Sequence, residues 1–135
     1  MKFKEDAPAM VPSELRYTKD HEWVRVEGDE ATVGITQYAA DQLGDIVYVE
    51  LPEVGRQVAQ FAAFGVVESV KAVSDLFAPV GGEVTATNAR LGAEPEAVNS
   101  DPYGSGWMLR LRLSDPAQVD NLLDAPGYDA LTSVG

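Results

Sequence analysis

The segment Phe64-Gly65-Val66-Val67-Glu68-Ser69-Val70-Lys71-Ala72-Val73-Ser74-Asp75-Leu76 decides the fold prediction. Two runs rich in Val and Phe, a composition typical of strands, flank a polar break at residues 69–72. The segment therefore predicts a β-hairpin with Lys71 at its tip. Tight two-residue turns favour Asn-Gly or another glycine-containing pair, because their central residues need positive φ. This tip contains neither Asn nor Gly, and such a broken local rule marks a candidate functional position.

Lys71 is also unusual in its place along the chain. The other lysines are Lys2, Lys4 and Lys19, so Lys71 is the only lysine after residue 19. A lysine amine is a flexible nucleophile that can be acylated to an amide, a role that arginine cannot fill. The position therefore suggests an attachment point for a covalent group. The alternative interpretation is an ordinary solvated lysine in a turn, because exposed lysines are common.

Length and composition exclude several classes of function. A chain of 135 residues and 14.5 kDa predicts a single domain, here residues 15–135, after a disordered or artificially added N-terminal arm at residues 1–14. Cysteine is absent, which excludes disulfides, thiolate zinc sites and thiol nucleophiles. The formal net charge of -12 argues against binding to nucleic acid or to an anionic membrane. With neither a secretory signal nor a membrane-spanning apolar run, we expect a cytoplasmic protein, most simply a monomer.

Hydrophobic alternation and turn residues predict mostly short strands. The predicted strands are residues 17–27, 31–36, 46–51, 57–59, 63–68, 72–78, 82–87 and 107–113. Helices are predicted from a Thr36 cap to Leu43, from Ser114 or Asp115 to Leu123, and from Pro126 to Leu131. Residues 88–91 are a predicted helical turn, and residues 94–99 a predicted loop. The pattern indicates an all-β dominated fold, a flattened β-barrel or sandwich with short flanking helices and a C-terminal helical segment.

The tip sequence Glu68-Ser69-Val70-Lys71-Ala72-Val73-Ser74-Asp75 resembles the lipoylation motif of glycine cleavage system H proteins. In that family an acidic residue precedes the modified lysine by three positions, as Glu68 does here. Further blocks in the family's order are Tyr17-Thr18-Lys19-Asp20-His21-Glu22-Trp23-Val24, residues 33–36 with 44–52, and Val98-Asn99-Ser100-Asp101-Pro102-Tyr103-Gly104-Ser105-Gly106-Trp107. The resemblance covers about residues 15–131. It implies a fold of the lipoyl-domain type.

Biotin carriers have a similar fold, but they usually place methionines on both sides of their lysine. Val70 and Ala72 occupy those positions here, which favours lipoate. One departure from the H-protein pattern lies at residues 55–63, where the family usually has a more polar turn. That departure leaves the geometry of this turn open, although it does not affect the attachment site.

The resemblance implies that lipoate is attached to Lys71 by a lipoyl-attaching enzyme, and that the protein is a carrier rather than an enzyme. It would shuttle an aminomethyl group from pyridoxal-phosphate glycine decarboxylase to aminomethyltransferase, and dihydrolipoyl dehydrogenase would then reoxidise its dihydrolipoate. Acidic side chains matching Glu22 and Asp75 would lie near the aminomethyl group in a surface cleft. Glu68 is assigned with them to recognition of the arm or to its cleft. Asp20, where the family often has Ser, is interpreted as a solvated acid.

Two alternatives remain open on the sequence. The protein could store or relay lipoyl groups to other carriers, a role that some H-like proteins have. It could also be a hydrolase built around His21, although a single histidine can form neither a metal cluster nor a Ser-His-Asp triad. A lone histidine beside Trp23 is more simply interpreted as a packing residue.

Overall fold

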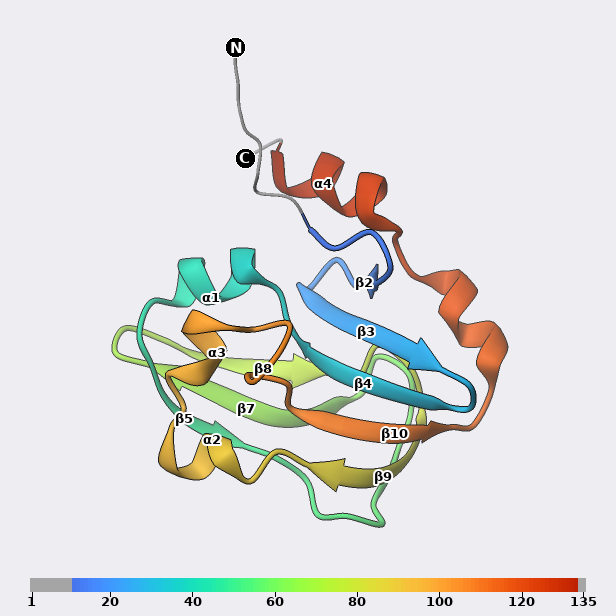
Figure 1. The fold of residues 1–135 in the computed structure, drawn as a ribbon, viewed down its shortest axis with the longest axis horizontal. Coiled ribbons are helices and arrows are strands. Elements are labelled where there is room, and N and C mark those ends of the chain that lie inside the picture. Colours follow the sequence, from blue (N-terminus) through green and yellow to red (C-terminus); the bar gives the residue numbers. More distant parts are fainter. Residues whose placement is uncertain (1–10, 134–135) are drawn as a thin grey trace.

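Two antiparallel sheets make up most of the molecule (Figure 1), whose computed structural model describes residues 11–133. The larger sheet has six strands in the order β2-β3-β4-β10-β9-β6, and the smaller has three in the order β5-β7-β8. The bounds of the strands are β2 Arg16–Tyr17, β3 Glu22–Glu27, β4 Glu30–Ile35, β5 Ile46–Glu50, β6 Gln57–Val58, β7 Ala63–Ser69, β8 Val73–Phe77, β9 Gly82–Thr87 and β10 Leu109–Leu113. The bounds of the helices are α1 Gln37–Leu43, α2 Arg90–Ala93, α3 Ala97–Ser100, the 3₁₀ helix η2 Pro116–Asn121 and α4 Ala125–Ser133.

The two sheets share one apolar core. It contains Val33 and Leu111 from the larger sheet and Val49, Val67 and Leu76 from the smaller one, all buried. Along β10 the buried Leu109 and Leu111 alternate with arginines that keep contact with water, which is the period of a strand with one buried face. Burial of this apolar surface holds the smaller sheet, and therefore its hairpin, on the larger one.

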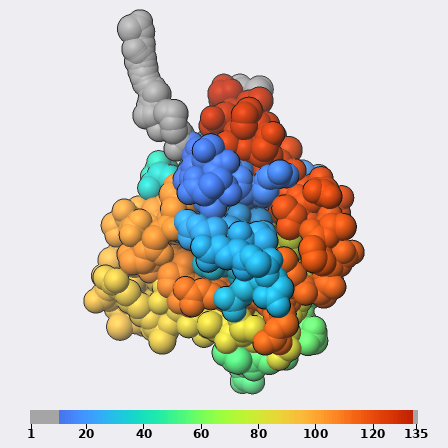
Figure 2. All heavy atoms as spheres, turned by 45° about the vertical axis from the view of Figure 1, so that its right-hand side comes forward, coloured from blue at the N-terminus to red at the C-terminus, as the bar shows by residue number. Residues whose placement is uncertain are grey.

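A second, aromatic cluster attaches the C-terminal helix to the larger sheet. Tyr128 of α4 stacks on Tyr17 of β2 with ring centroids 4.8 Å apart, and Trp23 of β3 is fully buried in the same cluster. Figure 2 shows the contact from outside, where the red helix lies against blue atoms of the segment around β2. The helix therefore packs on the segment around β2 and leaves the hairpin exposed.

The predicted fold class is confirmed, since strands in two antiparallel sheets dominate and a helix ends the described chain. The sheets do not close into a barrel. Thr36 caps α1 by accepting a hydrogen bond from the N–H of Ala39 at 3.2 Å, and Gly44, at φ 81°, ends this helix as predicted. Among residues 11–133 there is no helix with the length and apolar composition needed to span a membrane.

Some predicted elements were wrong in detail. The predicted strand at residues 17–27 is two strands, because the chain reverses at Thr18–His21, where His21 has φ 76° and Tyr17 pairs with Trp23. The predicted loop at residues 94–99 overlaps the short helix α3, which begins at Ala97 and ends at Ser100. Three smaller differences are that β10 begins at Leu109, that α2 lies two residues later than the expected turn, and that the helix after Pro116 is a 3₁₀ helix.

The predicted boundary between an N-terminal arm and the domain lies near the first described residues. The first ten residues of the predicted arm at 1–14, and residues 134–135, lie outside the described residues. Leu15, where the predicted domain begins, is buried in the aromatic cluster. The division into an arm and one domain of residues 15–135 stays a prediction.

We predict that Gly34→Ala destabilises the protein by about 1–3 kcal/mol, as expected for an overpacked core. A Cβ at Gly34 would lie 2.7 Å from atoms Cζ2 and Nε1 of Trp23. The indole cannot retreat freely, because it is fully buried and its Nε1 donates a hydrogen bond to the Pro102 carbonyl at 3.1 Å. Urea unfolding monitored by tryptophan fluorescence measures the loss.

The matched control is Gly92→Ala on α2, where an added Cβ meets nothing within 4 Å. It should leave the free energy of unfolding unchanged or raise it by up to about 1 kcal/mol, because alanine favours a helix more than glycine does. Equal stability of the Gly34 and Gly92 variants would contradict the tight Trp23 contact.

Candidate functional site

The candidate site begins at the turn of the β7–β8 hairpin. The N–H of Ser69 donates to the carbonyl of Ala72 at 2.8 Å, so Val70 and Lys71 are the two residues of the loop. Among the described residues, only His21 and Phe61 are non-glycine residues with positive φ. The loop is therefore neither a type I′ nor a type II′ turn, which are the types whose twist fits two strands best.

The Ser69 hydroxyl stabilises this unusual turn. Its Oγ accepts hydrogen bonds from the N–H groups of Lys71 at 3.2 Å and Ala72 at 3.1 Å. The hydroxyl therefore takes the place of a backbone carbonyl as acceptor, as serine does in other local turns. The sequence did not predict this role of Ser69, although a serine directly before a loop is a signal for it.

A brace from outside the hairpin also holds the tip. The N–H of Val70 donates to the carbonyl of Asp45 at 3.0 Å. Asn99 of α3 fixes the residues on both sides of Asp45, since its Oδ1 accepts from the Ile46 N–H and its Nδ2 donates to the Gly44 carbonyl, each at 2.9 Å. Asn99 belongs to a block quoted for the family resemblance, but the sequence did not indicate this contact.

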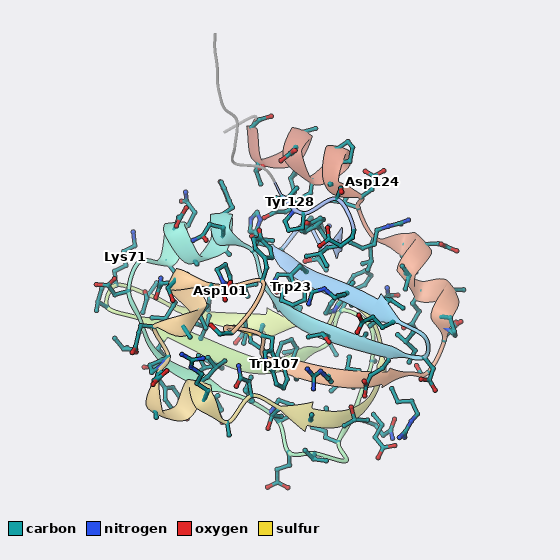
Figure 3. The ribbon with its side chains drawn as sticks, in the orientation of Figure 1. Trp23, Lys71, Asp101, Trp107, Asp124 and Tyr128 are labelled. Atoms are coloured by element: carbon teal, nitrogen blue, oxygen red, sulfur yellow. The ribbon has the colours of Figure 1, made fainter. Side chains whose placement is uncertain are left out.

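Lys71 is exposed to solvent at this braced tip. Its neighbours Val70 and Val73 are 69% and 67% exposed. Figure 3 shows Lys71 at the outer end of the hairpin, far from the labelled aromatic residues Trp23 and Tyr128. Within residues 11–133 the structure gives Lys71 no ion pair. The amine is thus presented to solvent on a turn held by hydrogen bonds to Ser69 and Asp45.

The predicted acidic residues Glu68 and Asp75 lie on the hairpin itself. Glu68 of β7 pairs with Val73 of β8, and Asp75 pairs with Val66. Asp75 is exposed and Glu68 half-buried. Asp75 follows Lys71 by four residues, roughly 13 Å along an extended strand. Both carboxylates therefore lie on the strands that lead to the tip, and among the described residues neither forms an ion pair with Lys71.

The third predicted acid, Glu22, is buried, with only 2% of its surface exposed. Its carboxylate accepts hydrogen bonds from the Thr18 hydroxyl at 2.5 Å and from the N–H of Phe77 at 3.1 Å. Burial raises the pKa of Glu22 from 4.5 to about 7, although both hydrogen bonds act in the opposite direction. A carboxyl group near half ionisation at neutral pH is unusual and is a candidate functional group.

Glu22 also explains how the exposed edge of the smaller sheet is completed. β8 is an edge strand, so the Phe77 N–H has no strand partner, and the Glu22 carboxylate from the larger sheet accepts its hydrogen bond. Phe77 follows Lys71 by six residues, roughly 20 Å along the chain. Glu22 therefore lies at the opposite end of β8 from the amine.

His21, next to Glu22 in the sequence, contacts residues of both α1 and α4. Its Nδ1 lies 2.7 Å from the Tyr128 hydroxyl, which lies 2.8 Å from the Oγ1 of Thr36. Its ring also lies against Tyr38, with centroids 4.9 Å apart. Burial lowers the pKa of His21, which favours the neutral ring that can accept a hydrogen bond. These contacts fit the packing interpretation better than a role as general base.

Two further features limit the chemistry. Residues 11–133 contain no cluster of three or more His, Asp or Glu side chains that could hold a metal ion. A hollow of about 500 Å³ lies at the Glu22 end of β8, between Thr18 and exposed Asp20 on one side and Phe61 and Leu122 on the other. The hollow is therefore distant from Lys71, where the sequence placed the attachment.

Comparisons with known proteins agree with this geometry. The family model described as "Glycine cleavage H-protein" matches residues 15–134. The glycine cleavage system H protein of Symbiobacterium thermophilum is 60% identical over 127 residues, which cover 94% of this chain and 99% of the relative. The one from Magnetococcus marinus is 62% identical over 120 residues, 89% of this chain and 86% of the relative.

A solved structure is also similar. The crystal structure of a glycine cleavage system H protein from Mycobacterium marinum superposes with a TM-score of 0.85 at 39% sequence identity. The match covers 91% of this chain and 99% of that chain. The hairpin with its exposed lysine, the two-sheet fold and these matches lead to one conclusion: the chain belongs to the glycine cleavage H-protein family.

Proposed function

We propose that this protein is the lipoyl carrier of a glycine cleavage system, with lipoate in amide linkage to Lys71. The observation that carries the proposal is the exposed amine of the only lysine after residue 19, held at a hairpin tip by Ser69, Asp45 and Asn99. Membership of the H-protein family supports it. A rigid tip suits an attachment point, because the chain itself then adds little motion to the arm.

The residues around the tip fit a lipoyl group. Lys71 offers a primary amine in water, with space around it and no carboxylate partner among the described residues, as amide formation requires. When bound, lipoate supplies the disulfide that accepts an aminomethyl group and electrons, chemistry for which this cysteine-free chain has no group of its own. The chain contributes the attachment, the support and the charged surface.

The role is that of a carrier subunit without catalytic activity. Its partners are glycine decarboxylase, aminomethyltransferase, dihydrolipoyl dehydrogenase and the lipoyl-attaching enzyme. An exposed tip allows one tethered group to visit several active sites, and tethering raises its effective concentration at each. A cytoplasmic location and a monomeric state stay predictions from the sequence.

Glu22 and Asp75 have a proposed part in holding the cargo. A protonated amine that leaves bulk water needs an acceptor with negative charge, and such a hydrogen bond contributes about 1.5–3 kcal/mol. Asp75 lies partway along β8, and Glu22 lies at its end, so both carboxylates follow the strand that starts beside Lys71. An ammonium group beside Glu22 would favour ionisation of a carboxyl group whose pKa burial has raised.

We predict that Lys71→Arg folds normally but accepts no lipoyl group. Arg keeps the positive charge at the exposed tip and lacks the acylable amine. Intact-mass spectrometry after incubation with a lipoate–protein ligase, lipoate and ATP should show one added lipoyl group on the wild type and none on the variant. Lys19→Arg is the control and should be modified like the wild type. A lipoyl mass on the Lys71 variant would refute attachment at this residue.

The carrier role has its own test. The lipoylated wild type should support exchange of bicarbonate into glycine by purified glycine decarboxylase, and the Lys71→Arg protein should not. A protein that only relays lipoyl groups to other carriers would become lipoylated and yet fail to support this exchange. That result would replace the proposal by the relay function.

We predict that the pH dependence of stability changes in Glu22→Gln. The pKa of Glu22 is about 7 in the folded protein and 4.5 when exposed, so between these values the folded chain holds a proton that the unfolded chain has released. Stability from the protonated carboxyl is thus complete below about pH 4.5 and is lost as the pH rises through about 7. Gln does not titrate, so the wild type should lose about 1–3 kcal/mol relative to the variant between pH 4.5 and 8.

Urea unfolding at several pH values measures this difference. Glu27→Gln is the control, because Glu27 is exposed at the end of β3 and water screens its charge. Its unfolding curve should follow that of the wild type throughout. Parallel pH profiles for wild type and Glu22→Gln would show that Glu22 does not titrate in this range.

A further inference from the structure

Exposed apolar side chains gather around the hairpin tip. The exposed large hydrophobic residues among residues 11–133 are Val26, Val47, Tyr48, Val54, Phe61, Val70, Val73 and Leu131. Val47, Tyr48, Val70 and Val73, half of this set, lie on the tip or on the adjacent end of β5. Exposed apolar side chains that lie together and are rimmed by polar residues are typical of an interaction site.

The strand register places some of these residues on one face. Tyr48 of β5 pairs with Glu68 of β7, which pairs with Val73 of β8. In the next row on the same face, Glu50 pairs with Val66 and Val66 with Asp75. The residues between these rows on β5 and β7, Val49 and Val67, point into the core. The rows therefore form the outer face of the smaller sheet.

We define the outer-face patch as Tyr48, Val73, Glu50, Glu68 and Asp75. Its apolar members Tyr48 and Val73 are 48% and 67% exposed. The carboxylates of Glu50 and Asp75 are exposed beside them, and within residues 11–133 no cation pairs with any of the three acids. The patch thus combines an exposed aromatic side chain, Tyr48, with three acidic side chains around it.

One partner must come closer to this patch than the others. An enzyme that acts on a loaded arm can work with its active site a full arm length from the tip. The enzyme that acylates the lysine has to bring its reacting carbon into bonding distance of Nζ itself. A side chain as short as lysine's cannot span a gap between two protein bodies, so the acylating enzyme must cover the residues around Lys71.

We infer that the outer-face patch is the docking surface of the lipoyl-attaching enzyme, which offers an apolar recess for Tyr48 and Val73 and cationic side chains for the three acids. This inference rests on the proposed function. In the step concerned, the neutral Lys71 amine attacks the carbonyl carbon of lipoate activated by ATP as a mixed anhydride with AMP. The N–C bond forms, the acyl C–O bond breaks, AMP departs with the bonding electrons, and the amine proton passes to solvent.

The composition of the patch fits this partner. Aromatic side chains at the centre of an interface contribute much of the binding energy, whereas surrounding charges mainly raise the association rate and exclude wrong partners. The carboxylates of the patch belong to a chain of net charge -12, so a cationic enzyme surface would be attracted from a distance. Salt should therefore weaken the encounter.

The test compares acylation kinetics of the unmodified chain by a lipoate–protein ligase with lipoate and ATP. For Tyr48→Ala we expect KM for the protein to rise about tenfold, as for loss of an interface anchor, with kcat within about twofold of the wild type. Glu50→Gln should flatten the increase of KM with salt concentration. Both side chains are exposed, so the midpoint of thermal unfolding should stay at the wild-type value.

Matched controls lie beyond the opposite end of β5. Val54 is 62% exposed, and Glu53 is an exposed acid beside it. Val54→Ala and Glu53→Gln should therefore keep the wild-type KM and its salt dependence. A second readout uses protein that already carries the lipoyl group, since loaded Tyr48→Ala should support glycine–bicarbonate exchange as the wild type does.

The outcomes separate this inference from the proposed function. Suppose that Lys71 of the wild type is acylated. If KM for Tyr48→Ala then stays within about twofold of the wild-type value, or if Val54→Ala raises KM as much as Tyr48→Ala does, the docking surface is wrong and the carrier role stands. If Lys71 of the wild type accepts no lipoyl group, the proposed function and the inference that rests on it both fail.

Discussion

The structure depends on a hairpin turn made without the residues that such turns usually contain. Val70 and Lys71 do not adopt positive φ, so the twist of the turn does not match that of β7 and β8. The Ser69 hydroxyl and the Asp45 carbonyl supply the missing hydrogen-bond acceptors. A turn made in this way can place a long functional side chain at its most exposed position, where a glycine would otherwise stand.

The rest of the fold keeps this turn in place. The core between the sheets holds the hairpin from below, and the two hydrogen bonds of Asn99 fix the segment that accepts the bond from Val70. The aromatic cluster around Tyr17 and Tyr128 holds the C-terminal helix on the larger sheet, away from the hairpin. The tip is therefore supported by the core beneath the hairpin and by the Asp45 segment, which Asn99 holds in place.

Charge is distributed in a way that suits a carrier. The amine at Lys71 lies at one end of β8, and the buried carboxylate of Glu22 lies at the other, where it completes the strand's edge. The first group is accessible to enzymes, whereas the second is shielded from water and has a raised pKa. One strand thus connects the proposed attachment position with the carboxylate that we propose holds the amine of the cargo.

The sequence by itself determined the features that are local along the chain. The hairpin with Lys71 at its tip, the Thr36 cap and the alternation of Leu109 and Leu111 follow from neighbouring residues, and the family motifs are contiguous blocks. Only the tertiary structure decided the burial of Glu22 and the Asn99 brace. The physical reason is distance along the chain: the bonds of Glu22 to Phe77 and of Asn99 to Gly44 each join residues 55 positions apart. A local pattern carries no information about such pairs.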